Sequence, residues 1–317
     1  MDMQTGSTER RDLSRREFLA ALAAVPLLAA CVGEPVDTAG GVAPLRATAS
    51  PAESADYARA NMLVSAEELA GMIGQEGVRV VALQPAEEFQ RLHIEGAAQI
   101  DWPALEVTDT SDASLERWRA DVERKLGALG IASEHEVVVY DAGTLFAARL
   151  WWVLHYLGHE KKRVLNGGLA AWRASAGQTA TSAAAPSEAA YSGVTQPDAV
   201  AQLSEVEDSL EDEGVVRLDA RSPEEYAAGH LPGAVNVQYT TNAMESSPKL
   251  WKPQAELRAM YEQAGAMSER RVIPYCSTGV RSAVTYFTLR LIGYEDVALF
   301  TGSWAEWSRH PELPVEK

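Results

Sequence analysis

The sequence is poor in cysteine, in basic residues and in long apolar runs, and each shortage excludes a class of protein. Two cysteines in 317 residues, Cys31 and Cys276, cannot build a framework of several disulfides. Lys and Arg number 28 against 45 Asp and Glu, which gives a formal net charge of −17. This charge argues against nucleic acid as a partner, because phosphate backbones need basic patches.

Residues typical of metal and nucleotide sites are also scarce. The six histidines are scattered without ligand spacing, and the segments "LNGG" and "STG" are too short for nucleotide phosphate loops. We therefore expect neither a metal nor a cofactor. A hydrophobic fraction of 46% and a charged fraction of 23% are ordinary for a globular protein, and the length suggests about two domains.

The first thirty residues have the order of an export signal. Arg15 and Arg16 precede the apolar segment 18–30, which is too short to span a bilayer as a stable helix. Small residues then lead to Cys31 in "LLAAC". The segment "SRREFL" resembles a twin-arginine export signal, and "LAAC" resembles the lipobox of bacterial lipoproteins. A buried hydrophobic helix is the alternative interpretation.

This resemblance implies a signal peptide over residues 1–30 that is cleaved before Cys31. It further implies a diacylglyceryl thioether on Cys31, export by the twin-arginine route, and a lipid anchor on the periplasmic or outer-surface side of a membrane. Residues 32–56 are rich in small and polar residues, so we predict a flexible tether over 31–60. Cys276 would then be the single free thiol, either buried or reactive.

The chain from 78 to 172 resembles the chain from 215 to 307, which indicates a duplicated domain. The segment "VRVVALQPAEEFQRLHIEGAAQI" overlays "VVRLDARSPEEYAAGHLPGAVNV", and "VVVYDAGTLFAARLWWVLHYLGH" overlays "VIPYCSTGVRSAVTYFTLRLIGY". Likewise "LNGGLAAW" resembles "LFTGSWAEW". We predict one domain over 61–176, a small and polar linker over 177–197, and a second domain over 198–317.

Strand-like and helix-like segments alternate in the second copy. This alternation predicts an α/β fold with a mainly parallel sheet flanked by helices. Reactive groups of such sheets gather at the carboxyl ends of strands, where Cys276 lies. The expected strands are 214–220, 233–237, 270–276 and 297–300, and the expected helices are 222–229, 253–265 and 281–293.

The loop "CSTGVR" puts a thiol where anions are stabilised. Ser277, Thr278 and Gly279 are small and allow a tight turn, and Gly279 tolerates a positive φ angle. Backbone N–H groups of such a turn converge on the sulfur at a helix start, and Arg281 adds a positive charge. Both effects favour the thiolate, which makes Cys276 a candidate nucleophile. The alternative is a buried and inert cysteine.

Three segments together resemble the rhodanese family of thiosulfate sulfurtransferases: "LDARSPEEYAAGHLPGAVNV", "YCSTGVRSA" and "GSWAEW". The tandem arrangement is similar to that of the two-domain members, and the resemblance covers nearly all of 62–315. It implies a rhodanese fold in each half and a persulfide on Cys276. In the implied double displacement, Cys276 takes the outer sulfur of thiosulfate, sulfite leaves, and the sulfur passes to cyanide or to a thiol.

The resemblance also carries roles to matching positions. Arg221, in "DAR", matches an arginine that reaches the substrate anion in some two-domain members, and Arg281 fills the last loop position. Four residues would supply loop amides to the substrate: Ser277, Thr278, Gly279 and Val280. We interpret Asp219 and His230 as structural, because direct sulfur transfer needs no strong general base once the thiolate exists. Four tryptophans are expected in the core or at a domain interface: Trp151, Trp152, Trp304 and Trp307.

The first copy departs from this pattern. Asp141 stands where Cys276 stands in the second copy, and an aspartate cannot carry a transferable sulfur. The other three replacements are Gln84 for Arg221, Ala82 for Asp219, and Phe146 for Arg281. The first copy therefore resembles the inactive half of tandem rhodaneses, with a role in packing and in the substrate cleft.

Three functions remain open from the sequence. A thiosulfate sulfurtransferase is favoured because the charge of Arg281 suits a dianion, with a 3-mercaptopyruvate sulfurtransferase as the near alternative. A non-catalytic persulfide carrier or sensor would instead hand its sulfur to a protein partner. A phosphatase is disfavoured, since related cysteine phosphatases have five residues between Cys and Arg and this loop has four.

Overall fold

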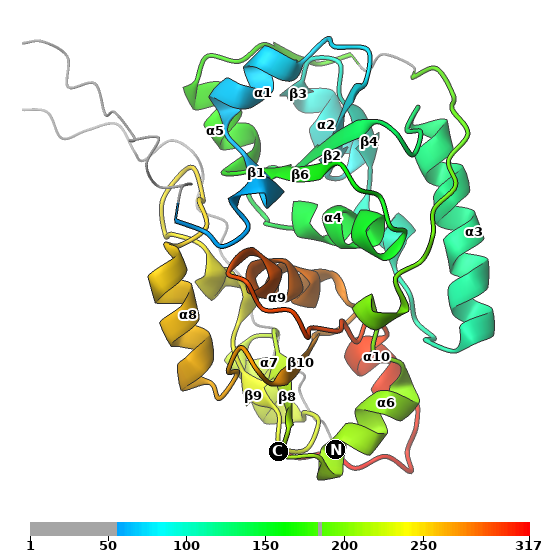
Figure 1. The fold of residues 1–317 in the computed structure, drawn as a ribbon, viewed down its shortest axis with the longest axis vertical. Coiled ribbons are helices and arrows are strands. Elements are labelled where there is room, and N and C mark those ends of the chain that lie inside the picture. Colours follow the sequence, from blue (N-terminus) through cyan, green and yellow to red (C-terminus); the bar gives the residue numbers. More distant parts are fainter. Residues whose placement is uncertain (1–55, 183–185) are drawn as a thin grey trace, which may run out of the picture. The chain divides into compact units, whose positions relative to one another are not determined.

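The structure is a computed structural model that describes residues 56–182 and 186–317 (Figure 1). The predicted signal peptide, Cys31 and most of the predicted tether lie outside these residues. All described residues belong to one unit of the chain, so contacts between the two copies of the repeat can be followed. We call residues 56–182 the first half and residues 186–317 the second half.

The first half is an α/β domain built on a five-stranded sheet, with strand order β1-β6-β5-β2-β4 and every pairing parallel. Its central strand is buried along Val137, Val138 and Val139, as expected for a strand covered on both faces. The elements are β1 Leu63–Val64, α1 Ala66–Met72, β2 Val78–Leu83, α2 Ala86–Arg91, β3 His93–Ile94, β4 Ala98–Ile100, α3 Asp112–Ala128, β5 Glu136–Tyr140, α4 Ala147–Tyr156, β6 Lys162–Leu165, α5 Gly168–Ala174 and β7 Thr179–Ala180.

The second half repeats this plan with a three-stranded parallel sheet of order β10-β8-β9. The predicted fold class is therefore confirmed. Helix α7 begins with a reciprocal cap, in which Ser222 and Glu225 each accept the other's backbone N–H. The elements are α6 Leu203–Asp208, β8 Val215–Asp219, α7 Pro223–Ala228, β9 Val235–Asn236, α8 Gln254–Gln263, β10 Arg271–Tyr275, α9 Val280–Leu291 and α10 Ser303–Trp307.

The strand predicted at 297–300 is wrong, because the structure has only isolated bridges at Val297 and Leu299. This segment does run beside β10: the N–H of Ala298 bonds the carbonyl of Val272, and the N–H of Phe300 bonds the carbonyl of Pro274. A parallel ladder would next use an N–H at position 274, which proline lacks. In the first half Val139 holds the matching position, and β5 pairs regularly with β6.

Replacing Pro274 with valine should extend this ladder. The new N–H at position 274 would gain an acceptor on the neighbouring segment, worth about 0.5–1.5 kcal/mol, while the more flexible unfolded chain offsets about 0.4–1 kcal/mol of it. We expect little change in the melting temperature but a slowly exchanging amide at residue 274, measured by hydrogen exchange. Fast exchange at residue 274 would contradict the explanation.

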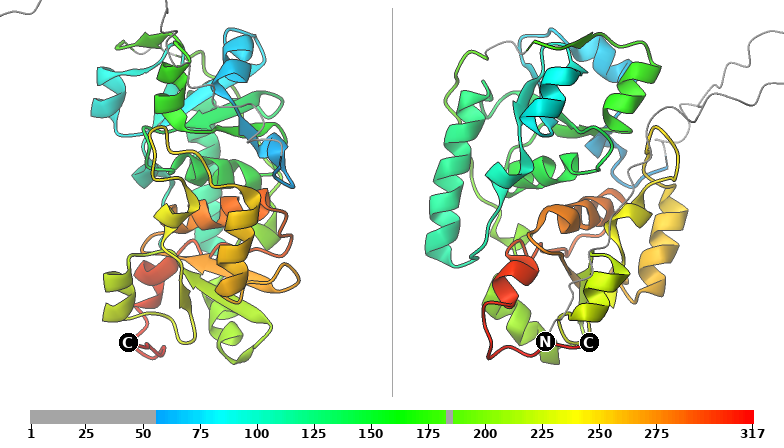
Figure 2. Two further views of the ribbon diagram at one scale, coloured as in Figure 1. Left: turned by 90° about the vertical axis from the view of Figure 1, so that its left-hand side faces the viewer. Right: turned by 180° about the vertical axis from the view of Figure 1, so that it is seen from behind.

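The two halves pack through α4 and α9, which lie side by side in all views (Figures 1 and 2). Trp151 of α4 meets Phe287 of α9 edge to face, with ring centroids 5.0 Å apart. The Nε1 of Trp152 donates to the carbonyl of Ala199 at 3.2 Å. Trp307 is fully buried in the second half. The prediction of a core or interface position is confirmed for Trp151, Trp152 and Trp307, and Trp304 packs partly buried against the core of the second half.

Two predicted connecting segments are held by contacts where the structure describes them. At the end of the predicted tether, the N–H of Arg59 bonds the carbonyl of Leu291 in the second half at 3.0 Å. In the predicted linker, β7 pairs antiparallel with β3, and the N–H of Ala189 bonds the carbonyl of Gly127. The packed chain thus starts before residue 61 and continues past residue 176.

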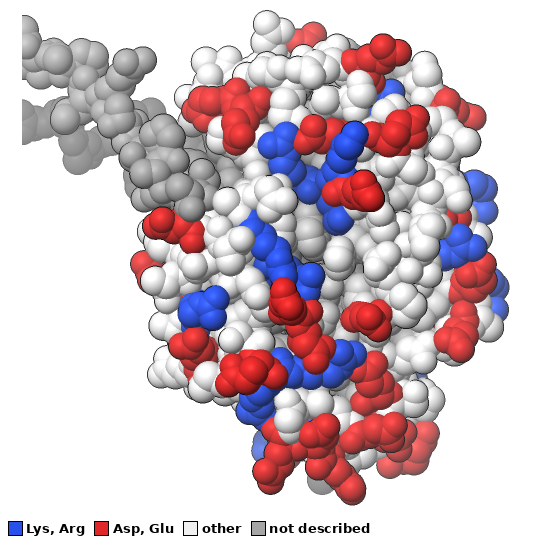
Figure 3. Space-filling view, in the orientation of Figure 1, with Lys and Arg blue, Asp and Glu red and all other residues white. Residues whose placement is uncertain are grey.

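The surface carries interspersed charges of both signs. On the face of Figure 3, Lys and Arg side chains alternate with Asp and Glu side chains. No helix within the described ranges is long and apolar enough to cross a membrane.

Candidate active site

The candidate nucleophile stands at the end of β10, just before α9. Between them Gly279 has φ +83°, a left-handed conformation that glycine adopts without strain. A Cβ at this position would lie 2.5 Å from the carbonyl oxygen of Thr301. Gly279 is therefore required for both conformation and space, and the tight turn expected from its sequence is present.

Cys276 is buried, with 1% of its surface exposed, and its sulfur accepts polar hydrogens. The N–H of Gly279 donates to the Sγ at 3.2 Å, and the hydroxyl of Ser282 donates at 3.4 Å. Both donors lie at the start of α9, where backbone N–H groups lack partners within the helix. The surroundings of the sulfur thus favour a negative charge.

The first half shows what this turn binds when an anion is built in. The carboxylate of Asp141 accepts the backbone N–H groups of Gly143, Thr144, Leu145 and Ala147 at 2.6 to 3.2 Å. Asp141 matches Cys276 in the repeat, so corresponding turns surround a carboxylate in one half and a thiol in the other, with positive φ angles at Gly143 and Leu145 in the first turn and at Gly279 in the second. The converging backbone N–H groups make the first-half turn an anion-binding nest.

The backbone of Cys276 is fixed from the other side by Ser303. The hydroxyl of Ser303 accepts the N–H of Cys276 at 3.1 Å and donates to the carbonyl of Phe300 at 2.8 Å. Ser303 has φ +55°, the same value as Gly168 at the matching position of the first half. A serine in a conformation suited to glycine carries strain, which such contacts at a functional site offset.

Arg281 is paired rather than free. Its guanidinium donates to both carboxylate oxygens of Glu225, at 2.6 and 2.8 Å, and to the hydroxyl of Ser277 at 2.6 Å. Hydrogen bonding to Arg281 lowers the pKa of Glu225 to about 2, so this carboxylate is ionised at neutral pH. The positive charge that the sequence assigns to the loop is therefore largely balanced by Glu225.

Arg221 is also held in place by its neighbours. Its guanidinium bonds the carboxylate of Asp219 and the carbonyl of Gly229, and it lies 4.7 Å over the ring of Trp304. Only 3% of its surface is exposed. No hydrogen bond joins Arg221 to Cys276 among the described residues, and the reach of Arg221 to a substrate anion stays a prediction.

Asp219 and His230, which the sequence analysis interprets as structural, are held by local contacts. Asp219 accepts the backbone N–H of Arg221 at 2.9 Å. The Nδ1 of His230 lies 2.9 Å from the carbonyl oxygen of Tyr226, and its ring stacks on that tyrosine with centroids 3.7 Å apart. Among the described residues, neither side chain forms a hydrogen bond with the sulfur of Cys276.

The rhodanese-like domain family matches two stretches of this chain, residues 65–175 and 202–310. The thiosulfate sulfurtransferase of Pseudomonas aeruginosa is 32% identical over 264 residues, which cover 80% of this chain and 97% of that protein. This chain belongs to the rhodanese family. The 3-mercaptopyruvate sulfurtransferase of Escherichia coli K12 is 30% identical over 243 residues, which cover 73% of this chain and 85% of that protein.

Solved structures agree on the rhodanese fold. The crystal structure of an Escherichia coli 3-mercaptopyruvate sulfotransferase aligns with a TM-score of 0.68 and 28% identity, over 77% of this chain and 99% of that one. An anaerobic ergothioneine biosynthesis enzyme from Chlorobium limicola aligns with a TM-score of 0.74 at 22% identity, over 82% and 71% of the two chains. The second likeness concerns the fold alone.

Sequence reasoning missed several residues of this rhodanese site. Glu225, Ser282 and Ser303 contact the loop, and a signal existed for two of them: Ser282 follows the loop directly, and Ser303 lies in the "GSWAEW" motif. The largest omission is Arg149 of the first half, which is fully buried and reaches the carbonyl of Gly279. Its signal was a single charge in the otherwise apolar segment of α4.

Aromatic side chains from both halves contact one another near Tyr239. The ring of Tyr239 lies 5.7 Å from that of Phe146, which in turn meets Trp102 at 6.3 Å. Burial raises the pKa of Tyr239, and the negative charges of Asp141 and Cys276 act in the same direction. Phe146, which replaces the loop arginine in the first half, thus contributes to an apolar wall between the halves.

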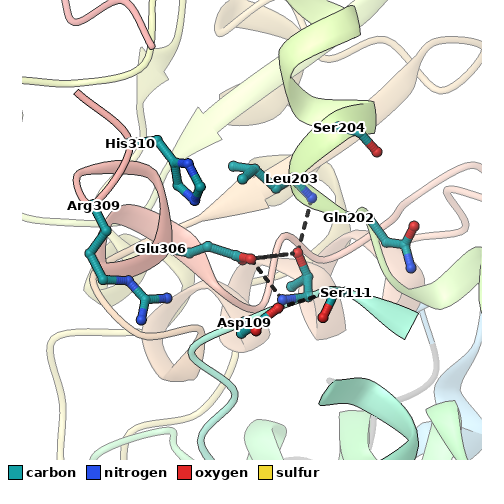
Figure 4. A pocket seen from close by; sticks show the side chains of 9 residues that line it. Asp109, Ser111, Gln202, Leu203, Ser204, Glu306, Arg309 and His310 are labelled. Carbon is teal, nitrogen blue, oxygen red and sulfur yellow. Dashed lines mark hydrogen bonds between the residues drawn. The ribbon is translucent and has the colours of Figure 1, made fainter. Parts of the chain in front are cut away.

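A separate cavity of about 570 Å³ lies where the halves meet at α6 and α10, and Cys276 does not line it (Figure 4). Inside it the carboxylate of Glu306 accepts the N–H of Thr110 at 2.7 Å and the Thr110 hydroxyl at 2.9 Å. That hydroxyl also accepts the N–H of Leu203 at 2.9 Å. The contact joins α10 to the first half.

Glu306 should make stability depend on pH. Burial raises its pKa above the ordinary 4.5, so the stability that it contributes when protonated is lost as pH rises through the folded-state pKa. Glutamine does not titrate, so we expect the melting temperature of Glu306→Gln minus that of the wild type to increase between about pH 4.5 and pH 7. Thermal unfolding across this range measures the difference, with exposed Glu76→Gln as the control. A difference that stays constant with pH would contradict the assignment.

Proposed function

We propose that this protein is a sulfurtransferase that moves sulfane sulfur from thiosulfate to cyanide or a thiol through a persulfide on Cys276. The observation that carries the proposal is the turn around Cys276, because its twin in the first half holds a carboxylate with four backbone N–H groups. A turn built for an anion favours the thiolate, which is the nucleophilic form of cysteine. Relatives named sulfurtransferases, matched over most of this chain, support the same activity.

The proposed reaction has two displacements. In the first, the thiolate attacks the outer sulfur of thiosulfate, the S–S bond breaks, and sulfite leaves with the bonding electron pair. In the second, cyanide or a thiolate attacks the outer sulfur of the persulfide, and the Cys276 thiolate is released. No external oxidant or reductant is consumed, and no cofactor is required.

The loop residues are proposed to hold the transferred sulfur. The first-half carboxylate bonds N–H groups at the positions of Thr278, Gly279, Val280 and Ser282. In the second half the Cys276 Sγ accepts a hydrogen bond from the N–H of Gly279. The other three N–H groups would therefore surround the outer, negatively charged sulfur of the persulfide. Ser277 and Arg281 hold the loop through their bonds to Glu225, and Arg281 also lies near the sulfur of Cys276.

The sulfur donor is proposed as thiosulfate, with 3-mercaptopyruvate as the alternative. The Arg281 charge, on which the sequence preference rests, is balanced by Glu225 and favours neither donor strongly. Relatives of both names match at about the same identity. A persulfide carrier or sensor is the second candidate, because the buried sulfur could also be passed to a protein thiol.

The first test measures sulfur loading on the full chain with Cys31→Ser, which leaves Cys276 as the single thiol. Incubation with thiosulfate should add one sulfur atom in the intact mass, and none to the Cys276→Ser variant. Cyanide should remove that sulfur with repeated formation of thiocyanate. Loading from 3-mercaptopyruvate but not from thiosulfate would make 3-mercaptopyruvate the sulfur donor. Loading without turnover would favour the persulfide carrier. No loading from either compound would refute the proposal.

Asp141→Asn is the matched test of the inactive half. The variant should keep most of the sulfur-transfer rate, because Asp141 carries no sulfur. Its melting temperature should fall, because the N–H of Ala147 loses a charged acceptor at 2.9 Å. A loss of activity as large as that of Cys276→Ser would contradict the division of roles.

We further propose that the protein is exported by the twin-arginine route and anchored by lipid at Cys31. Support comes from the order of Arg15, Arg16, an apolar core and a small-residue approach to the cysteine. In a bacterial host, labelled fatty acid should be incorporated into the wild type and not into Cys31→Ser. Replacing both arginines with lysine should retain the precursor inside the cell. Equal labelling of wild type and Cys31→Ser would refute the anchor.

A further inference from the structure

Arg149 is a buried charge without a carboxylate partner. It lies in α4 of the first half and has no measurable exposure. Its Nη1 donates to the hydroxyl of Thr301 at 2.9 Å and to the carbonyl of Gly279 at 3.5 Å, and its Nη2 donates to the carbonyl of Leu105. Its guanidinium lies 4.6 Å from the ring centre of Trp152.

Such an arrangement is costly unless a negative charge lies near. Arginine is almost never fully buried without an ionic partner, because removing an ion from water carries a large free-energy penalty. Within the described ranges no carboxylate forms an ion pair with Arg149, and its Nε has no hydrogen-bond partner. The Nη1 and Nη2 of Arg149 donate their hydrogen bonds to neutral oxygens.

The anionic groups near Arg149 are the Cys276 thiolate, when it is ionised, and the carboxylate of Glu106. Burial lowers the pKa of Arg149 to about 10, and the negative charges of Cys276 and Glu106 act against this decrease. The other cation near the sulfur is Arg281, which is already balanced by Glu225. Arg149 is thus a cation near Cys276 that forms no ion pair with a carboxylate among the described residues, although the charge of Glu106 acts on it.

We infer that Arg149, from the half without a cysteine, is a positioning residue for Cys276. It fixes the turn by bonding Gly279 and Thr301, and it supplies the balancing positive charge for the sulfur anion. The inference deepens the proposed sulfurtransferase function and rests on it. It also gives the first half a direct part in the chemistry, through a residue whose counterpart in the second half is Val284.

The groups that act on the sulfur anion come from several elements. Arg149 of α4 and Arg281 of α9 stabilise it. Tyr239 of the short 3₁₀ helix Tyr239–Asn242 also faces it, and burial raises the pKa of this tyrosine, so it is neutral at physiological pH. The Asp141 carboxylate acts on the same tyrosine. Removing Arg149 alone therefore changes the balance by one positive charge.

The test uses three variants of the full chain with Cys31→Ser. Arg149→Met removes the charge and keeps the length, and Arg149→Lys keeps the charge without the planar fork. Arg163→Met is the control, because the Arg163 guanidinium bonds Glu136 in the first half and no loop residue. Two readouts are taken: the rate of Cys276 alkylation by iodoacetamide from pH 5 to pH 10, and the rate of single-turnover sulfur loading from thiosulfate.

We expect Arg149→Met to be about tenfold less reactive than the wild type at pH 6 and to approach it at pH 10, because a lost cation disfavours the thiolate. Loading from thiosulfate should slow by a similar factor near neutral pH. Arg149→Lys should recover most of the rate at pH 6, and Arg163→Met should follow the wild type throughout. Melting temperatures of all variants check that each one is folded.

The outcomes separate the inference from the function. If Arg149→Met is folded and keeps the wild-type pH dependence of alkylation, the inference is wrong even when the wild type loads sulfur. A uniform loss at every pH would also overturn it, because that is the signature of damaged packing. If the wild type loads no sulfur, the proposed function fails, while the alkylation profiles still decide whether Arg149 balances the thiolate.

Discussion

The whole site depends on one local geometry, a turn in which backbone N–H groups point inward between a strand end and a helix start. In the second half this turn contains a glycine at φ +83°, where an added Cβ would lie 2.5 Å from a neighbouring carbonyl oxygen. The parallel sheet delivers the chain to this point, since β10 ends at Tyr275 and α9 begins at Val280. The duplication provides an internal comparison, because Asp141 occupies the matching turn with a permanent charge.

The two halves contribute different residues to the candidate active site. The second half holds the nucleophile, while the first half holds a carboxylate in its own turn and extends α4 across the interface. Through α4 it contributes the Trp151 contact to Phe287 and the buried guanidinium of Arg149. A tandem protein with one degenerate copy can thus retain that copy because it completes the site of the other.

The sequence was sufficient for the fold class, for the duplication and for the turn around Cys276. These features follow from local patterns, namely apolar strands, a small-residue turn and a helix start. The missing strand at 297–300 was also visible in principle, since Pro274 lies in the partner strand. The pairing of Arg221 with Asp219 and of Arg281 with Glu225 could not be read from the chain, because a long cationic side chain reaches several neighbours. Arg149 could not be placed at all without knowing that α4 packs on the second half.

The most direct test of the account is a crystal structure after treatment with thiosulfate. The account predicts an additional sulfur atom on Cys276, lying inside the turn and within hydrogen-bonding distance of the N–H groups of Thr278, Val280 and Ser282. The arrangement would then match the Asp141 carboxylate in the first half. An additional sulfur that points away from the turn, or a cysteine that remains unmodified while the protein turns over, would contradict the central claim.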